Sequence, residues 1–397
     1  MERRHFLKAV GIAGAGAAWT PTLAQRPRLY DILIKGGEVI DPSRAFRGIA
    51  DVAVLDGKVA AIESSIAAER GIDVVDAKGL LVTPGLVDLH THIHYGLQLG
   101  IEADPVAARS GTTTWVDAGT FAQNEVSGFR RFIVEPARAR IYGFVYLYPS
   151  NRNPDDDTIK YVNGMMDRTG RMAVANRDII LGVKLQVGSN MNGRYSLEFL
   201  KIARRLCDKY ELPLMVHISF APPSTDEVME LMRPGDVITH CYNTHTLGIV
   251  DDQGKIKASV LDARARGVLF DVGHGVGSFN FDVARKALDQ GFLPDTISTD
   301  IYDLNVDGPV YDMPTTMSKM LVLGMTFDDV LKRSTVNPAR IINRVEGMGT
   351  LAVGAPADIA LLETAKGQFQ LVDSQRNRHT TKEKLVSRLT ICRGKRL

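Results

Sequence analysis

The 397-residue sequence contains few cysteines and no marked excess of charge of either sign. Its three cysteines, Cys207, Cys241 and Cys392, are odd in number and far apart, which argues against a disulfide framework. Lysine and arginine number 48 against 46 aspartates and glutamates, so the formal net charge is +2. This balance gives no reason to expect a nucleic acid or a membrane surface as a partner, and it favours a small-molecule substrate.

The sequence also lacks short-period repeats, heptad runs and low-complexity tracts. Apolar residues make up 45% and charged residues 24% of the chain, which is typical of an ordinary soluble globular protein. The length allows two or three domains, or one large barrel with an appendage.

The first residues differ in composition from the rest. Arg3 and Arg4 open an RRxFLK pattern, and a mildly apolar run rich in Gly and Ala follows over 9–18. This combination resembles a twin-arginine export signal, and the run is too short and too rich in glycine to span a bilayer. A short N-terminal helix is the alternative, which the glycines disfavour. The sequence therefore predicts a signal peptide over 1–24, cleaved after Ala24, with export by the twin-arginine machinery to the periplasm.

Both ends of the remaining chain have the pattern of short strands and turns. Residues 30–82 contain DILIKGGEVI, DVAVLDGKVAAI and IDVVDAKGLLV, separated by GG, DP and DG turn signals. A matching stretch, GTLAVGAPADIALLE, begins at Gly349 and leads into more strand-like sequence. We therefore predict one small β-sandwich built from residues 25–82 and 349–397.

The middle of the chain, 83–348, alternates apolar strands with segments of helical period. The eight strand candidates are GLVDLHTH, TTTWVDAG, RIYGFVYLY, ILGVKLQV, LPLMVHIS, DVITHCYN, VLFDVGHG and DTISTDIY. Eight β/α repeats in this length predict a closed parallel (β/α)8 TIM barrel, whose active site lies at the carboxyl ends of the strands.

Six residues suited to a two-metal hydrolytic site fall at the ends of five of these strands. They are His90, His92, Lys184, His217, His240 and Asp300. Taken singly, each histidine would more often be a hydrogen-bonded core residue, and a buried aspartate is usually a cap or a member of an ion pair. Their order and placement together favour metal ligation and a metallohydrolase, in which Asp300 can also accept a proton from bound water.

His90 and His92 are two residues apart and therefore point to the same side of a strand, about 7 Å apart along the backbone. His94 shares that face, so the sequence also permits a pair of His92 and His94. His94 stands next to Tyr95-Gly96, where the chain must already turn, which favours His90 and His92 as the ligand pair.

Lys184 requires a separate explanation because an ammonium group would repel two metal ions. Two divalent cations also need more negative charge than Asp300 alone supplies. Carboxylation by CO2 would turn the lysine into a carbamate that can bridge both ions, and a bridging hydroxide would supply further charge. The alternative is an ordinary lysine paired with a buried acid.

The combination of motifs resembles the amidohydrolase superfamily, specifically its amidohydrolase/deacetylase metallohydrolases, relatives of dihydroorotases. The matching stretches are PGLVDLHTH, GVK, VHIS with APP, THCYN, GVLFDVGHGVGSFNF, DTISTDIY, GPVYDMPTTMSKMLVLGM, NPAR, GTLAVGAPADIALL and DILIKGG. Two positions depart from the pattern of many relatives: Gln186 stands where a basic residue is common, and Tyr302 where a histidine is common.

The resemblance implies that His90 and His92 hold one divalent ion with Asp300, that His217 and His240 hold a second, and that carboxylated Lys184 bridges them. Zinc suits these ligands, although manganese, iron and cobalt are not excluded. It further implies hydrolysis of an amide or ester by a metal-bridging hydroxide, with Asp300 moving the proton.

Several strand-end residues are candidates for substrate contact. They are His274, Tyr148, Tyr242, Asn243 and Tyr302. The glycines around His274 fit neither common phosphate-binding motif and are interpreted as permitting close approach of the backbone.

Three other functions are weighed against amide or ester hydrolysis. The same ions could open a cyclic imide, lactam or lactone, as in dihydroorotase-like enzymes. A non-catalytic member of the fold would typically have lost ligands, whereas all six positions are filled. A lyase or isomerase using the same pocket is the third option.

Overall fold

The computed structural model describes residues 29–147 and 154–397. The predicted signal peptide and Tyr148 lie outside the described residues.

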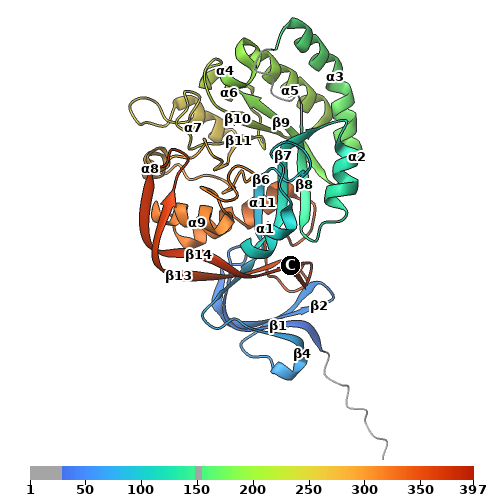
Figure 1. Ribbon diagram of the computed structural model, residues 1–397, viewed down its shortest axis with the longest axis vertical. Coiled ribbons are helices and arrows are strands. Elements are labelled where there is room, and N and C mark those ends of the chain that lie inside the picture. Colours follow the sequence, from blue (N-terminus) through green and yellow to red (C-terminus); the bar gives the residue numbers. More distant parts are fainter. Residues whose placement is uncertain (1–28, 148–153) are drawn as a thin grey trace, which may run out of the picture.

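A parallel sheet forms the centre of the larger part of the molecule (Figure 1). Its strands are β6 (Leu86–Thr91), β7 (Thr112–Ala122), β8 (Arg140–Tyr146), β9 (Ile180–Val187), β10 (Leu214–Ile218), β11 (Val237–Thr239) and β12 (Leu269–Phe270). They lie in the order β12-β11-β10-β9-β8-β7-β6, with every neighbouring pair parallel. The first seven strand candidates correspond to these strands.

The eighth candidate, DTISTDIY, is not a regular strand, but it lies between the two edges of the sheet. Parallel bridges join Asp271 to Thr296 on one side and Thr91 to Ile301 on the other. Backbone bonds from Val272 N to Thr296 O (3.1 Å) and from Asp300 N to His90 O (2.7 Å) continue this pairing. The segment thus closes the seven strands into a TIM-like barrel, as predicted.

Helices surround the sheet (Figure 1). They are α1 (Ala103–Ser110), α2 (Val126–Gly128), η2 (Phe129–Val134), α3 (Asp156–Ala175), α4 (Ser189–Asn192), η3 (Gly193–Tyr195), α5 (Ser196–Tyr210), α6 (Thr225–Leu231), α7 (Ala258–Ala265), α8 (Phe281–Asp289), α9 (Met313–Val322), α10 (Phe327–Arg333) and α11 (Val336–Ile342). Capping boxes at Asp155 and Ser224 explain where α3 and α6 begin, because these side chains accept the otherwise unpaired backbone N–H groups. In α5, Phe199, Leu200 and Leu206 are buried in the main hydrophobic core.

The two ends of the chain combine into a second sheet. The first part contains β1 (Tyr30–Asp41), β2 (Phe46–Leu55), β3 (Lys58–Glu63), η1 (Ala68–Arg70), β4 (Gly71–Asp76) and β5 (Leu81–Pro84), and the second contains β13 (Ile359–Val372), β14 (Arg378–Cys392) and β15 (Lys395–Arg396). Pairing of β5 with β13 joins them in one eight-stranded sheet with its own hydrophobic core. The predicted union of both chain ends is confirmed, while a separate β-sandwich domain stays a prediction.

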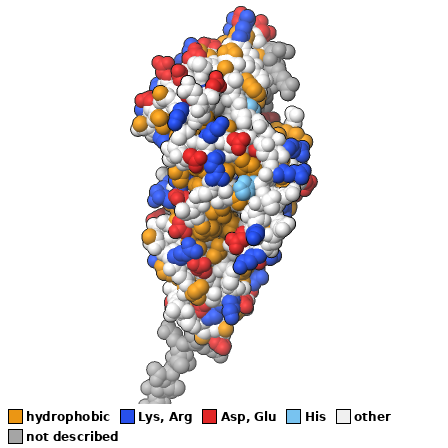
Figure 2. All heavy atoms as spheres, turned by 90° about the vertical axis from the view of Figure 1, so that its left-hand side faces the viewer, with side chains coloured by type: hydrophobic (Ala, Val, Ile, Leu, Met, Phe, Trp, Pro, Cys, Tyr) orange, Lys and Arg blue, Asp and Glu red, His pale blue; other side chains and the backbone are white. Residues whose placement is uncertain are grey.

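Strands β13 and β14 form a long antiparallel ribbon, hereafter the ribbon, which extends from this sheet along the barrel to α8 (Figure 1). Residues 373–377 connect the two strands and are called the ribbon turn. The face on the left-hand side of Figure 1 is turned toward the viewer in Figure 2, and hydrophobic side chains gather around its middle. Among the described residues, none of the helices has the length and apolar character needed to cross a bilayer.

Candidate metal centre

The structure brings all six predicted ligand residues to one cavity at the carboxyl ends of the barrel strands. The cavity has a volume of about 240 Å³, and its lining includes His90, His92, Lys184, His217, His240 and Asp300. β6, β9 and β10 carry or immediately precede four of them, His240 follows β11, and Asp300 lies in the closing segment. Parallel strands place their carboxyl ends on one side of the barrel, which explains why positions distant in sequence meet here.

His90, His92 and Asp300 form the first half of the site. Asp300 Oδ1 lies 3.3 Å from His90 Nε2 and 3.2 Å from His92 Nε2. One ligand atom from each residue can be chosen so that all lie within 4.8 Å of one another, which is close enough to hold a metal ion. His94 is outside this cluster, because its ring stacks on Phe129 with centroids 5.7 Å apart.

His217, His240 and Lys184 form the second half. The His217 and His240 rings meet edge to face with centroids 4.3 Å apart, and His240 lies 5.0 Å from His90. Lys184 Nζ lies 3.0 Å from Ala118 O and 3.1 Å from His90 Nε2. No ion pair between Lys184 and an acid occurs in the described part of the chain, so the ordinary buried-pair alternative is not what the structure shows.

Hydrogen bonds to Nδ1 orient two of the histidine rings unambiguously. The Thr239 hydroxyl donates to Asp271 Oδ2 at 2.8 Å, so it can only accept at the 2.8 Å contact with His90 Nδ1. His240 Nδ1 must likewise donate to the carbonyl oxygen of Gly273, at 2.6 Å. In both rings the proton is therefore on Nδ1, and the lone pair on Nε2 faces the cavity.

Burial makes the site electrostatically unusual. Loss of solvent lowers the pKa of His240 to about 4 and lowers those of His90 and His217 well below the usual value, with Lys184 adding to the effect at His90. These imidazoles are therefore neutral near pH 7 and available as ligands. Burial also lowers the pKa of Lys184 to about 8, against the opposing influence of Asp300.

Two of the ligand residues have strained backbones. His240 and Asp300 adopt left-handed conformations, with φ of 66° and 49°, which non-glycine residues rarely do. Two glycines leave room for them: a Cβ on Gly273 would lie 2.8 Å from His240 Nδ1, and one on Gly275 would lie 2.3 Å from Asp300 Oδ2. The expectation that these glycines permit close approach of the backbone is confirmed.

The side chains present fit divalent cations. His217 Nε2 is buried and has no hydrogen-bond partner, which is costly unless another group occupies that position. The Nε2 atoms of His90 and His240 point their lone pairs toward the same cavity, and Asp300 supplies negative charge beside them. Imidazole and carboxylate donors in this combination suit zinc and related ions.

The residues predicted to contact substrate have different positions. Tyr302 lines the cavity. His274 and Tyr242 are fully buried and do not line it, and the Tyr242 hydroxyl donates to Phe292 O at 2.9 Å. Asn243 donates to Ile218 O and His240 O, so its placement favours a structural role in holding the ends of β10 and β11.

Other residues that were not among the predicted contacts also line the cavity. They are Leu99, Met191, His245, Val276, Gly277 and Ser278. Gln186, which stands where many relatives have a basic residue, lines the cavity as well. Only Gln186 had a sequence signal, because it follows Lys184 by two residues on one strand. A neighbouring cavity of about 600 Å³ shares His92 and Gln186 and adds Tyr146, whose hydroxyl donates to Gln186 Oε1 at 2.7 Å.

The chain belongs to the amidohydrolase family, whose sequence model matches residues 81–397. It is 36% identical to a deacetylase of Agrobacterium fabrum over 326 residues, which cover 80% of this chain and 79% of that protein. It is 34% identical to a deacetylase of Brucella anthropi, with 80% of each chain covered. A deacetylase of Enterococcus faecalis is 31% identical and is covered over 98% of its length.

Solved structures agree with this membership. A crystal structure described as an adenine deaminase has a TM-score of 0.83 and 30% identity, covering 93% of this chain and 99% of that one. A crystal structure described as a dihydroorotase also has a TM-score of 0.83, with 32% identity and coverage of 92% and 97%. Membership of the amidohydrolase family indicates a hydrolytic enzyme, and the two solved structures show that one fold is shared by proteins described with different substrates.

Proposed function

We propose that this protein is a binuclear metal-dependent hydrolase that cleaves an amide or ester bond, of the deacetylase or N-acyl amidohydrolase type. The observation that carries the proposal is that one cavity gathers the four candidate-ligand histidines, Lys184 and Asp300. Similarity to proteins named deacetylase over most of the chain supports the type of reaction.

We assign His90, His92 and Asp300 to one ion and His217 and His240 to the other, with Lys184 carboxylated and shared between them. When bound, such ions polarise the substrate carbonyl and lower the pKa of water. The carbamate would remove the positive charge of Lys184 and supply negative charge to the half of the site that contains His217 and His240.

Asp300 is the proposed proton carrier. Its backbone N–H donates to His90 O at 2.7 Å, and its carbonyl oxygen accepts from Asn305 Nδ2 at 2.7 Å, so the backbone that carries the carboxylate is held in place. In this position Asp300 would take a proton from the attacking water and give it to the leaving nitrogen or oxygen.

The cavity wall fits a substrate with an apolar part and a neutral polar part. Leu99, Met191 and Val276 offer apolar contact, whereas Gln186 and Tyr302 offer hydrogen-bonding groups. The alternative remains ring opening of a cyclic amide, imide or lactone, which is favoured by the likeness to a solved dihydroorotase.

The test is elemental analysis of the purified mature protein combined with a panel of N-acyl amino acids, acyl esters and cyclic imides. We expect divalent metal in the protein, turnover of acyl substrates, loss of turnover on chelation and recovery on adding zinc. If the protein turns over cyclic imides and none of the acyl substrates, the proposed hydrolysis of an acyl amide or ester is wrong and ring opening takes its place. Undiminished turnover by metal-free protein would reject the proposal.

We also propose that the chain is exported to the periplasm by the twin-arginine route. The support is the RRxFLK pattern near the N-terminus. Cell fractionation should find the mature product in the periplasm when the full-length gene is expressed, and replacement of both Arg3 and Arg4 by Lys should retain the protein in the cytoplasm. Equal periplasmic yield of the two forms would contradict this route.

A further inference from the structure

The ribbon turn contacts the segment that follows β12, although about 100 residues separate them in sequence. This segment, residues 273–280, is called the β12 loop. Val276, Gly277 and Ser278 of the β12 loop line the cavity that holds the candidate metal ligands. The end of the ribbon therefore lies directly behind one wall of the cavity.

Ser374 of the ribbon turn forms hydrogen bonds to the β12 loop on both sides of residues 276–278. Its hydroxyl lies 3.2 Å from His274 O and 3.1 Å from Gly275 O, to which it can donate, and it accepts from Phe279 N at 3.1 Å. Its backbone N–H donates to Phe279 O at 3.0 Å. One residue thus bonds the chain just before and just after the three residues that face the cavity.

The neighbours of Ser374 strengthen this contact. Asp373 is buried, and its Oδ2 accepts from Phe281 N at 3.1 Å and from Asn280 Nδ2 at 3.3 Å. Gln375 Nε2 donates to Thr244 Oγ1 at 2.5 Å, beside the cavity-lining His245. The ribbon turn therefore holds two loops, the one after β11 and the one after β12.

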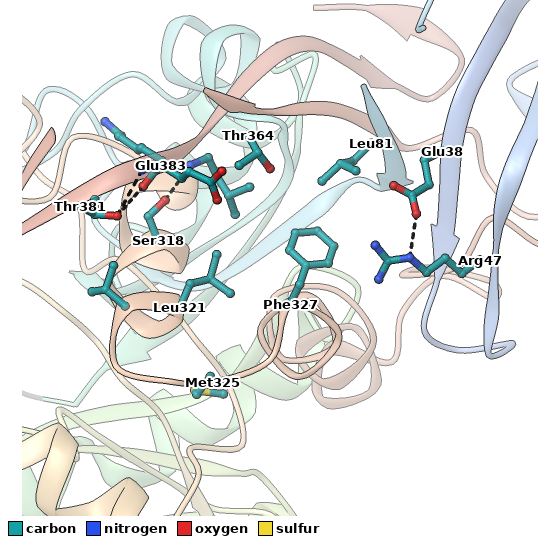
Figure 3. Close-up of a pocket in the computed structure, with 13 residues that line it drawn as sticks. Glu38, Arg47, Leu81, Ser318, Leu321, Met325, Phe327, Thr364, Thr381 and Glu383 are labelled. Carbon is teal, nitrogen blue, oxygen red and sulfur yellow. Dashed lines mark hydrogen bonds and ion pairs between the residues drawn. The ribbon is translucent and has the colours of Figure 1, made fainter. Parts of the chain in front are cut away.

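The ribbon is also held by packing, because Leu371 beside the ribbon turn lies in the main hydrophobic core. Between its base and its turn, the ribbon is anchored to α9 where Leu385 N donates to Ser318 Oγ at 2.9 Å. A cavity of about 600 Å³ lies beside this anchor, between the ribbon and the apolar side chains of Leu321 and Phe327 (Figure 3). The bonds of the ribbon turn add a hydrogen-bonded attachment to this packing at the far end of the ribbon.

The part of the β12 loop that supports the metal ligands has its own fixation. Gly273 N donates to Ser298 Oγ at 3.0 Å, while Gly273 O accepts from His240 Nδ1. The His274 ring stacks on Phe279 at 4.7 Å and accepts from Lys319 Nζ at 2.7 Å. Loosening residues 276–278 should therefore disturb the substrate wall more than the ligand geometry.

We propose that Ser374 is a positioning residue that holds residues 276–278 of the β12 loop in place for substrate binding. This inference rests on the proposed function for its kinetic part. Its structural part, that the ribbon turn restrains the β12 loop, can be measured without any substrate.

The test compares Ser374→Ala with Ser374→Thr and with Ser387→Ala in the full-length protein. Ser387 provides a matched control because it lies on the same ribbon and its hydroxyl has no hydrogen-bond partner. Amide hydrogen exchange over residues 274–280 and the KM and kcat for the best acyl substrate are measured for each form. Ser374→Thr keeps a hydroxyl and should preserve wild-type behaviour.

For Ser374→Ala we expect faster exchange in the β12 loop and a KM raised about threefold to tenfold, with kcat within about twofold of wild type. Ser387→Ala should change none of these. Unchanged exchange in Ser374→Ala, or faster exchange with unchanged KM, would overturn the positioning role. If the wild-type protein turns over no member of the substrate panel, the proposed function fails, and the exchange comparison alone decides whether Ser374 restrains the loop.

Discussion

The two halves of the candidate metal centre differ in what brings their side chains together. In the first half, one carboxylate oxygen of Asp300 contacts both His90 and His92, so an acid organises the cluster. In the second half, His217 and His240 meet through their rings, and the nearby charged group is the lysine at 184. The first half therefore already resembles a ligand set, whereas the second needs an added negative charge to hold a cation.

The sharpest way to break the first half is Asp300→Asn, which keeps the shape of the side chain but removes its charge and its ability to carry a proton. Turnover should fall by about a hundredfold to ten-thousandfold, because positioned acid–base groups contribute about that much. Much of the metal content should remain. The exposed Asp303 provides the matched control, and Asp303→Asn should keep wild-type kcat. Equal turnover by the two variants would reject the assigned role of Asp300.

The second half is tested by Lys184→Met, which removes the nitrogen that would carry the carbamate. We expect loss of one of the two proposed ions and of most turnover, measured by elemental analysis and by initial rates. Lys257→Met makes the same change at a half-buried lysine that does not line the cavity, and it should retain both ions. A Lys184→Met protein with full metal content would show that the lysine does not complete the second half.

A smaller effect should come from the hydrogen bonds behind His90. Thr239→Val removes the hydroxyl that links His90 Nδ1 to Asp271, so the imidazole loses the partner that fixes its proton and orientation. Loss of such a partner typically lowers metal affinity about tenfold to a hundredfold. Competition with a chromophoric chelator measures this affinity. Thr120→Val tests the equivalent contact of His92 Nδ1, at 2.8 Å, and similar losses in both would show that the first half depends on both threonines.

The last prediction concerns the stability of the folded protein rather than its activity, through Lys319 beside the β12 loop. Burial lowers the pKa of Lys319 to about 7 from its ordinary 10.5, while Asp373 and Asp312 raise it and Lys384 lowers it. Between these two values the unfolded chain binds a proton that the folded chain does not. The free energy of unfolding should therefore rise with pH in this window, by up to about 1.4 kcal/mol per pH unit.

Urea unfolding of wild type and Lys319→Met at a series of pH values checks this sign. The stability of wild type relative to the variant should increase from about pH 7 to about pH 10 and should be flat below about pH 7. A constant difference across the series would contradict a neutral Lys319 in the folded protein.

The sequence predicts the barrel well because each strand is a short apolar run that ends in a polar residue. The eighth run fails to become a regular strand, since Asp300 turns into a left-handed conformation where the strand would continue. The glycines after β12 explain in the same way why that strand has only two residues, Leu269 and Phe270. Local backbone geometry of this kind follows from contacts with the cavity rather than from apolar periodicity.

The candidate ligands could be predicted because strand ends meet at one side of a barrel, whatever the lengths of the loops between them. The same signal predicts that Tyr242 and Asn243 contact substrate. Both follow a strand, but the Tyr242 side chain is buried in the core and the Asn243 side chain bonds backbone carbonyl groups. His245 lies only two residues further on, yet it reaches the cavity through the path of its loop. No periodicity in the sequence specifies that path, nor the register that brings Ser374 to the β12 loop.

The pairing of β5 with β13 has a consequence for biosynthesis. A nascent chain that has emerged only as far as residue 357 already possesses every candidate ligand, yet β5 still lacks β13, one of its two neighbours. A truncation after residue 372 would likewise spare all the candidate ligands and would remove both the ribbon turn and two of the eight strands of the sheet, β14 and β15. A stop codon in this range should therefore leave the cavity without part of its supporting wall, even though all six candidate ligands are present.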